Sequence, residues 1–276
     1  MSDILQQVVI DAASIPNVSW SVCLRDAQGH VLAELDAEVP LPTASVGKLF
    51  LMTEVALQYE KGSIARDDLL SRNPSVAVKN SGILQYLTQK SLPVEDLVVL
   101  VASVSDNYAT NILLERIGLP RIHQLAIELG LKSTSLLDRV RNERGDDHPP
   151  CLSVGSAEEL SGFMDAVRGE NLISPEVSAT MDRWMGLNAD LSMVASALGI
   201  DPLAHLDSDR NLVLRNKTGT DSGVRADVGY ITAPRSAASY AVIARWNEKH
   251  DEGPTRDAVL AAMRAIGNEL RNYVTA

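Results

Sequence analysis

The chain has 276 residues, of which 45% are hydrophobic and 22% charged, a composition typical of a globular protein with a sizeable core. Its net charge is −11 and its acidic residues are spread out, which argues against nucleic acid and anionic membranes as partners. Since the sequence has no long apolar run, we expect no membrane-spanning helix. The start, Met1-Ser2-Asp3, lacks signal-peptide features, so we expect a cytoplasmic protein, although a chain with its signal removed would look similar.

The first segments alternate between helix and strand signals. Residues 3–15 have a helical period, and the residues available for burial are Ile4, Val8, Ile10 and Ala12. Residues 18–25 and 30–35 are rich in β-formers, and the Asp26-Ala27-Gln28-Gly29 segment between them is a hairpin signal. The sequence therefore predicts a helix followed by a two-stranded hairpin.

The next helix is apolar around its whole circumference. It is expected to begin at Thr43 or Ser45 and to end at Lys61-Gly62. Leu49-Phe50-Leu51-Met52 leaves no polar face, so this helix should be buried. Lys48 lies in its first turn, and burying an ammonium group is costly unless the group is paired or deprotonated. A functional lysine is therefore favoured over a solubilising one, on the same face as Ser45 because residues three apart are neighbours on a helix.

Helical periodicity dominates the middle of the chain, and strand signals return near the end. Helices are expected at 94–104, 107–118, 121–130, 156–168, 174–186 and 191–198. The charged segment 139–150, which contains glycine and two prolines, indicates a loop. Strands are expected at 212–217, 224–231 and 239–246, before a closing amphipathic helix at 255–273.

This order predicts an α/β (α+β) fold. Hairpin-type connections imply an antiparallel sheet flanked by the terminal helices, which residues 1–44 and 205–276 would form. Residues 45–204 would form an all-helical domain. The active site is expected in the cleft between the two parts.

Cysteine and histidine usage predicts neither a metal site nor a cofactor. Cys23 and Cys151 lie far apart and fit no metal-ligand spacing, so we expect buried free thiols. The histidines lie in polar stretches and are expected at the surface: His30, His123, His148, His205 and His250.

Three short motifs occur once each, in the order Ser45-Val46-Gly47-Lys48, Ser105-Asp106-Asn107 and Lys217-Thr218-Gly219. Singly, each has an ordinary structural interpretation: an N-capping serine with a solvated lysine, a helix cap or turn, and a strand end. Together they supply a hydroxyl nucleophile, a nearby lysine, a second hydroxyl and a strand-borne lysine. That set supports acyl transfer through a serine ester without histidine.

In these motifs the chain resembles the class A β-lactamases and the penicillin-binding proteins that share their fold. The segment 109–114 is similar to the family's helix after the second motif, and Leu137-Asp138-Arg139 looks like the entry to its Ω loop. Arg225 resembles the arginine that reaches the substrate carboxylate. Ser81-Gly82-Ile83-Leu84 is similar to a branch of β-lactamase-like proteins.

The resemblance implies roles for the first two motifs. Ser45 would be the nucleophile, favoured by the positive end of its helix, and Lys48 a candidate base. Ser105 would relay a proton to the departing amine. Asn107 would hold a substrate amide and orient Lys48.

The third motif would bind substrate. The strand Lys217-Thr218-Gly219 would hold the substrate carboxylate with Arg225 behind it, although Arg225 also fits a surface position on a hairpin. The backbone N–H groups of Ser45 and Thr220 would form the oxyanion hole.

The chain departs from the class A pattern in the Ω loop. The family's water-activating glutamate would stand at the position of Arg141, and the nearest carboxylate is Glu143, which is either a displaced base or a solvated charge. We therefore expect a serine hydrolase that opens a β-lactam amide through an acyl-enzyme on Ser45. The alternatives are a penicillin-binding protein that stays acylated, or an esterase or peptidase on a cytoplasmic small molecule. The sequence does not determine the oligomeric state.

Overall fold

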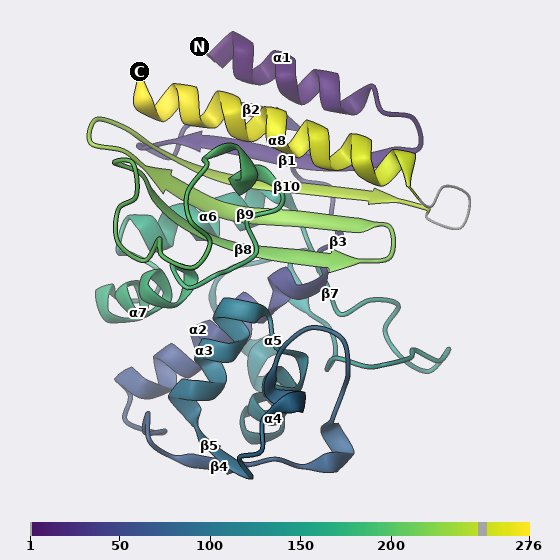
Figure 1. Ribbon diagram of the computed structural model, residues 1–276, viewed down its shortest axis with the longest axis vertical. Coiled ribbons are helices and arrows are strands. Elements are labelled where there is room, and N and C mark those ends of the chain that lie inside the picture. Colours follow the sequence, from purple (N-terminus) through teal and green to yellow (C-terminus); the bar gives the residue numbers. More distant parts are fainter. Residues whose placement is uncertain (1, 248–252) are drawn as a thin grey trace.

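The computed structural model describes residues 2–247 and 253–276. A five-stranded sheet in the order β2-β1-β10-β9-β8 occupies one end of the molecule (Figure 1). All its neighbouring strands are antiparallel. Its strands are β1 (Val18–Asp26), β2 (Val31–Leu35), β8 (Val213–Asp221), β9 (Val224–Thr232) and β10 (Ala237–Trp246). The pairing of β1 with β10 joins the two ends of the chain in one sheet, so the predicted antiparallel sheet is confirmed.

Helices cover both faces of this sheet. The terminal helices α1 (Ser2–Ala13) and α8 (Pro254–Thr275) lie side by side over one face (Figure 1). The helix α6 (Ala157–Arg168) packs against β1, β9 and β10 from the other. Successive side chains of a strand point to opposite faces. Accordingly, Val242 belongs to the core under the terminal helices, whereas Ile243 belongs to the core that α6 shares with the helical lobe.

The buried face of α1 agrees with the prediction at Ala12 and, in part, at Val8, and differs from it elsewhere. Leu5, Val9 and Ala12 are buried, whereas Ile4 and Ile10 are 56% and 50% exposed. Both sets have helical spacing, so periodicity alone did not distinguish them. Packing against α8 and β2 decides which set faces the core.

The lower lobe in Figure 1 is built around α2 (Lys48–Glu60), which is buried continuously from Lys48 to Leu57 as its all-apolar sequence predicted. The helices around it are α3 (Val94–Val104), α4 (Asn107–Ile117), α5 (Leu119–Glu128) and α7 (Pro175–Met185). The predicted α+β fold with a helical lobe is therefore confirmed, with element ends shifted by a few residues.

The segment 45–204 is not wholly helical. Its short strands are β4 (Leu69–Ser71), β5 (Ser91–Pro93), β6 (Ser135–Leu136) and β7 (Ser153–Gly155). β7 pairs with β6 and with β3 (Leu41–Pro42), and so ties the lobe to the segment that enters it. The helix expected at 191–198 is only the 3₁₀ turn Val194–Ala197, which packs on α8. The domain boundary at 204/205 stays a prediction.

One histidine prediction is wrong. His205 is only 3% exposed, and its Nδ1 lies 2.9 Å from the carbonyl oxygen of Asp201. Cys23 is buried and Cys151 partly buried, both as free thiols, while His250 lies outside the described residues. Within residues 2–247 and 253–276, no helix is long and apolar enough to cross a membrane.

Candidate active site

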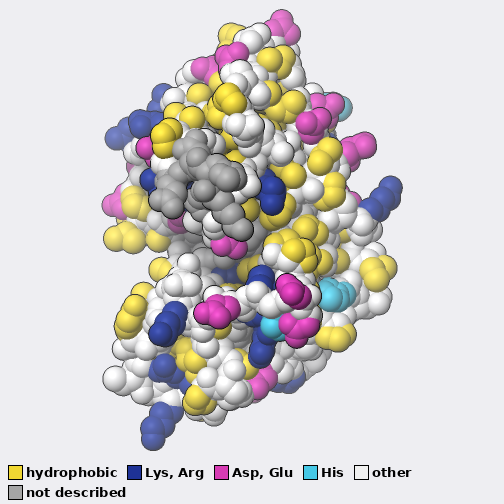
Figure 2. All heavy atoms as spheres, turned by 90° about the vertical axis from the view of Figure 1, so that its right-hand side faces the viewer, with side chains coloured by type: hydrophobic (Ala, Val, Ile, Leu, Met, Phe, Trp, Pro, Cys, Tyr) yellow, Lys and Arg dark blue, Asp and Glu magenta, His cyan; other side chains and the backbone are white. Residues whose placement is uncertain are grey.

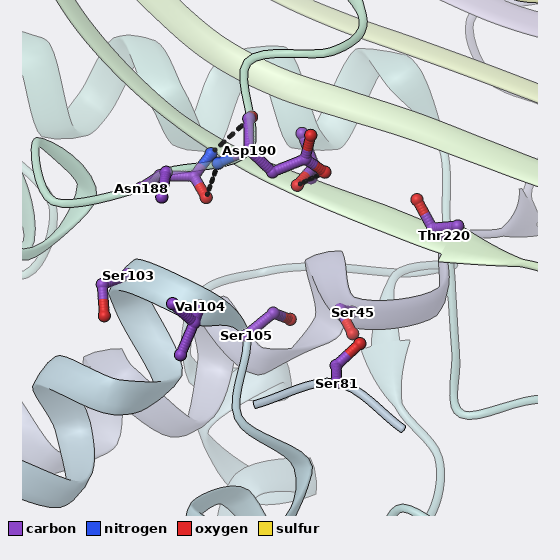
Figure 3. A pocket seen from close by; sticks show the side chains of 10 residues that line it. Ser45, Ser81, Ser103, Val104, Ser105, Asn188, Asp190 and Thr220 are labelled. Carbon is purple, nitrogen blue, oxygen red and sulfur yellow. Dashed lines mark hydrogen bonds between the residues drawn. The ribbon is translucent and has the colours of Figure 1, made fainter. Parts of the chain in front are cut away.

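A cavity of about 390 Å³ lies between the helical lobe and β8, the edge strand of the large sheet (Figure 3). Its position agrees with the predicted cleft. The residues that line it come from five separate parts of the chain: Ser45, Ser81, Ser103, Val104, Ser105, Asn188, Ala189, Asp190, Thr218 and Thr220.

Ser45 lies in the 3₁₀ turn Ala44–Gly47, immediately before α2. The N-cap residue of α2 is Gly47, so the prediction that α2 starts at Thr43 or Ser45 is early by one turn. Strand β7 anchors this turn, because the hydroxyl of Ser153 donates to the carbonyl oxygen of Ala44 at 2.6 Å. The Ser45 hydroxyl is therefore not used as a helix cap, and Ser45 faces the cavity.

Two motif glycines allow the close packing around this turn. A Cβ at Gly47 would lie 2.3 Å from the Cβ of Ser153, and a Cβ at Gly219 would lie 2.0 Å from the carbonyl oxygen of Thr43. Only glycine fits at contacts this short. A Cβ at Gly219 would also lie 3.1 Å from the backbone nitrogen of Ser45. Strand β8, with Thr220 as its next residue, therefore packs closely against the turn that carries Ser45. The pairing of these two backbone N–H groups as an oxyanion hole stays a prediction.

Lys48 is fully buried, and its ammonium group is surrounded by oxygen acceptors. Its Nζ donates to the carbonyl oxygen of Ser105 at 2.7 Å, to the Ser105 hydroxyl at 3.2 Å and to Oδ1 of Asn107 at 2.8 Å. Burial, aided by the nearby charge of Lys217, lowers the pKa of Lys48 well below its usual value. The lowered pKa favours the neutral amine of Lys48, and its role as a base stays a prediction.

The Ser105 hydroxyl joins the two lysines. Ser105 ends α3 in the left-handed conformation, with φ of 54°, which turns its side chain toward the cavity. Its Oγ is 3.2 Å from Nζ of Lys48 and 3.1 Å from Nζ of Lys217. Burial lowers the pKa of Lys217 to about 8, although Asp190 and Asp227 act to raise it. A hydroxyl between two amines can pass a proton from one to the other.

The remaining residues of the second motif hold the cavity wall. Asp106 caps α4 through the backbone N–H of Ala109 and also accepts the N–H of Leu84 at 2.7 Å. Asn107 donates from Nδ2 to the carbonyl oxygen of Lys79 at 3.2 Å. These contacts fix the segment that carries Ser81, which points toward Ser45 in Figure 3.

Arg225 does not line the cavity. It lies opposite Thr220 in the β8–β9 ladder, and its guanidinium donates to the carbonyl oxygens of Asp221 and Val224. It also lies over the ring of Trp246, 5.7 Å from the ring centre. The structure therefore does not bring Arg225 together with the motif residues, and its role in binding a carboxylate stays a prediction.

The loop 139–150 forms a separate ionic cluster. Asp138 accepts two hydrogen bonds from Arg141 and one from Arg144. Burial acts to raise the pKa of Asp138, but these bonds hold it below its usual value. Glu143 is exposed and lies by a different hollow, next to Asn111. Figure 2 shows the face that carries this loop, where acidic, basic and histidine side chains gather. Arg141 is thus part of a structural ion pair, and Glu143 is outside the Ser45 cavity.

Sequence reasoning missed the segment 188–190 as part of the site. Asn188 is buried and donates from Nδ2 to Oδ1 of Asn216 at 2.8 Å, beside the third motif. Asp190 then points into the cavity, where its Oδ2 accepts the hydroxyl of Thr218 at 2.8 Å. The segment follows α7 without a helical or strand period, so only the tertiary structure reveals its position.

Comparisons with known proteins agree with this architecture. The extended-spectrum beta-lactamase PER-1 of Pseudomonas aeruginosa is 26% identical over 211 residues, which cover 70% of this chain and 63% of PER-1. The chain therefore matches less than two thirds of that relative's length.

Two solved structures have the same fold. A beta-lactamase from Sphaerobacter thermophilus superposes with a TM-score of 0.85 at 21% identity, covering 100% of this chain and 98% of that one. PBP-A superposes with a TM-score of 0.82 at 18% identity, covering 100% and 97%. The family model described as the beta-lactamase enzyme family matches residues 1–274. With the three motifs gathered at one cavity and this match over almost the whole chain, the protein belongs to the beta-lactamase enzyme family.

Proposed function

We propose that this chain is a serine hydrolase of the class A β-lactamase type, which opens a small-molecule amide by forming an ester on Ser45. The observation that carries the proposal is the Ser105 hydroxyl, which both Lys48 and Lys217 contact beside the cavity that Ser45 lines. This arrangement supplies a nucleophile, a base and a proton relay, the parts that acyl transfer needs.

The reaction begins with Lys48, whose lowered pKa favours the neutral amine. Lys48 takes the proton of the Ser45 hydroxyl as its oxygen attacks the amide carbon. The carbonyl oxygen becomes an oxyanion, which the backbone N–H groups of Ser45 and Thr220 are suited to stabilise. Ser105 then gives its proton to the departing nitrogen and regains one from a neighbouring lysine. The C–N bond breaks, and the acyl group stays on Ser45 as an ester.

A specific observation favours a second candidate, a protein that stays acylated. Hydrolysis of the ester needs a base that activates water, and a positioned base contributes about 10² to 10⁴ in rate. Glu143 is exposed and lines a different cavity, and Arg141 forms an ion pair with Asp138. Ser45 and Ser105 thus line the cavity, whereas neither Arg141 nor Glu143 does, which supports a protein that forms the ester but hydrolyses it slowly.

Intact-mass spectrometry after exposure to benzylpenicillin tests both candidates. Acylation predicts a mass increase equal to one penicillin, absent in Ser45→Ala. Ser103→Ala is the matched control, because Ser103 also lines the cavity but donates its hydroxyl to Val99 of its own helix. An adduct that survives Ser45→Ala, or no adduct on the wild-type protein with either benzylpenicillin or its methyl ester, refutes the proposal. Loss of the adduct with time indicates a hydrolase, and a stable adduct indicates a trap.

A further inference from the structure

The position that the family resemblance assigns to a substrate carboxylate already contacts a carboxylate of the protein. The hydroxyl of Thr218 donates to Oδ2 of Asp190 at 2.8 Å. Among the described residues that line the cavity, Asp190 alone carries a charge. Figure 3 shows its side chain beside β8, across the cavity from the helix that ends in Ser105.

The Asp190 carboxylate is held in place by its own neighbours. Its Oδ1 accepts the backbone N–H of Ser192 at 3.2 Å and the Ser192 hydroxyl at 2.6 Å. The side chain of Asn188 bonds the backbone of Asp190 through both its amide nitrogen and its amide oxygen, at 3.1 and 3.3 Å. Because Asn188 is in turn bonded to Asn216 of β8, the carboxylate is fixed relative to the strand.

Asp190 interacts electrostatically with Lys217 and acts to raise its pKa, but neither Lys217 nor Lys48 lines the cavity. Lys48 and Lys217 are both fully buried, and their ammonium groups donate to oxygens of the protein. An incoming carboxylate that took the Thr218 hydroxyl would lie beside the Asp190 carboxylate, and like charges in contact repel. A neutral group, or one that donates a hydrogen bond, would instead gain a charged acceptor at the same place.

We propose that Asp190 sets the substrate class of this site to amides and lactams that carry a neutral or hydrogen-bond-donating group, rather than a carboxylate, beside the scissile bond. The proposal rests on acylation at Ser45. Asp190 acts here as a specificity-determining residue, through the group that it presents to substrate and through its contact with Thr218.

Binding measured without acylation tests the proposal first. In a Ser45→Ala background, calorimetry gives the Kd values of benzylpenicillin and of its methyl ester, which differ in one charge. We expect the ester to bind at least 10-fold more tightly than the acid. Adding Asp190→Asn should shift the ester-to-acid ratio by about 10- to 100-fold toward the acid, the range for a hydrogen bond to a charged group. Tighter binding of the acid to the Asp190 protein, or an unchanged ratio in the variant, would overturn the proposal.

Acylation rates then separate this proposal from the proposed function. With Ser45 present, mass spectrometry follows adduct formation by the same acid and ester in wild type and Asp190→Asn. No adduct with either compound refutes acylation itself, whereas adducts with an unchanged ester-to-acid ratio refute only the role of Asp190. Asp67→Asn is the control for the loss of one negative charge, because Asp67 is exposed and outside the cavity. Should Asp190→Asn lack a cooperative melting transition, the ratio in the Ser45→Ala protein alone decides.

Discussion

The three motifs and the loop 139–150 differ in how the structure holds their side chains in position. Ser45, Ser105 and Lys217 each lie at a rigid boundary: a 3₁₀ turn anchored on β7, the end of α3, and the edge strand β8. The loop runs in turns and bends, and is held in part by the ion pairs of Asp138 with Arg141 and Arg144. Side chains on rigid elements are positioned more accurately than those on loops. The structure therefore holds the three motifs on rigid elements, and it places neither Arg141 nor Glu143 at the cavity that Ser45 lines.

The two regions also use charge differently. In the motifs, burial destabilises the ammonium forms and lowers the pKa values of Lys48 and Lys217. In the loop, arginine partners stabilise the ionised form of Asp138. Burying the two lysines costs stability but favours their reactive neutral form. The ion pairs of Asp138 stabilise the fold and contribute no reactive group. Five measurements test this contrast.

Removing Lys48 should have the largest effect. Lys48→Ala takes away the buried amine next to Ser105 and should slow acylation of Ser45 by about 10²- to 10⁴-fold, the contribution of a general base. Time-resolved intact-mass spectrometry with benzylpenicillin measures this rate. Lys61→Ala, at the exposed C-terminal end of the same helix, should leave it unchanged. Equal rates for Lys48→Ala and wild type would return Lys48 to a purely structural role.

Removing the charge of Asp138 should affect stability rather than acylation. Asp138 is 5% exposed and pairs with Arg141 and Arg144, so Asp138→Asn should lower the free energy of unfolding by about 1.5–3 kcal/mol. Urea unfolding measures this change, and Asp146→Asn, exposed in the same loop, should stay within about 0.5 kcal/mol of wild type.

The pH dependence of the Asp138 effect has a definite sign. Its pKa is lowered in the folded protein, so its contribution to stability is present above the unfolded pKa of about 4 and is lost as the pH falls through the folded value. The difference between wild type and Asp138→Asn should therefore shrink on acidification. A difference that does not change with pH would contradict the ion-pair explanation.

The charge of Lys217 should limit acylation in alkaline solution. Its pKa is lowered to about 8, so it loses its proton above that pH, well before an exposed lysine would. Since the neutral amine no longer offers a charged donor to the Ser105 hydroxyl, acylation should fall by up to about tenfold per pH unit above 8. Lys217→Arg keeps the charge and should be slower but without this fall. An identical fall in both proteins would assign it to another group.

The smallest effect is expected at Glu143. Because Glu143 is exposed and outside the Ser45 cavity, Glu143→Gln should change the rate of ester hydrolysis by no more than about twofold, as expected for a surface substitution. The decay of the acyl-enzyme mass after removal of free penicillin measures this rate. An adduct that becomes long-lived in Glu143→Gln, with normal acylation, would show that the loop delivers a displaced base.

Local sequence patterns were sufficient for the elements whose signal is unambiguous. The all-apolar run after Lys48 predicted a buried helix, and the three strand signals after residue 212 predicted the antiparallel strands β8, β9 and β10. Such patterns are informative because the spacing of apolar residues along the chain determines whether a helix or a strand places them on one buried face. The order of the three motifs also predicted the chemistry, through the resemblance to the class A β-lactamases.

The tertiary structure decided everything that depends on contacts between distant segments. It selected Leu5 and Val9 over Ile4 and Ile10 in α1, and it buried His205 in a segment that looks polar. It placed the Asp190 carboxylate on the Thr218 hydroxyl, and it left Glu143 outside the cavity. In each case the sequence allowed more than one arrangement of equal local quality, and the choice came from packing and hydrogen bonds between residues far apart in the chain, which no local period encodes.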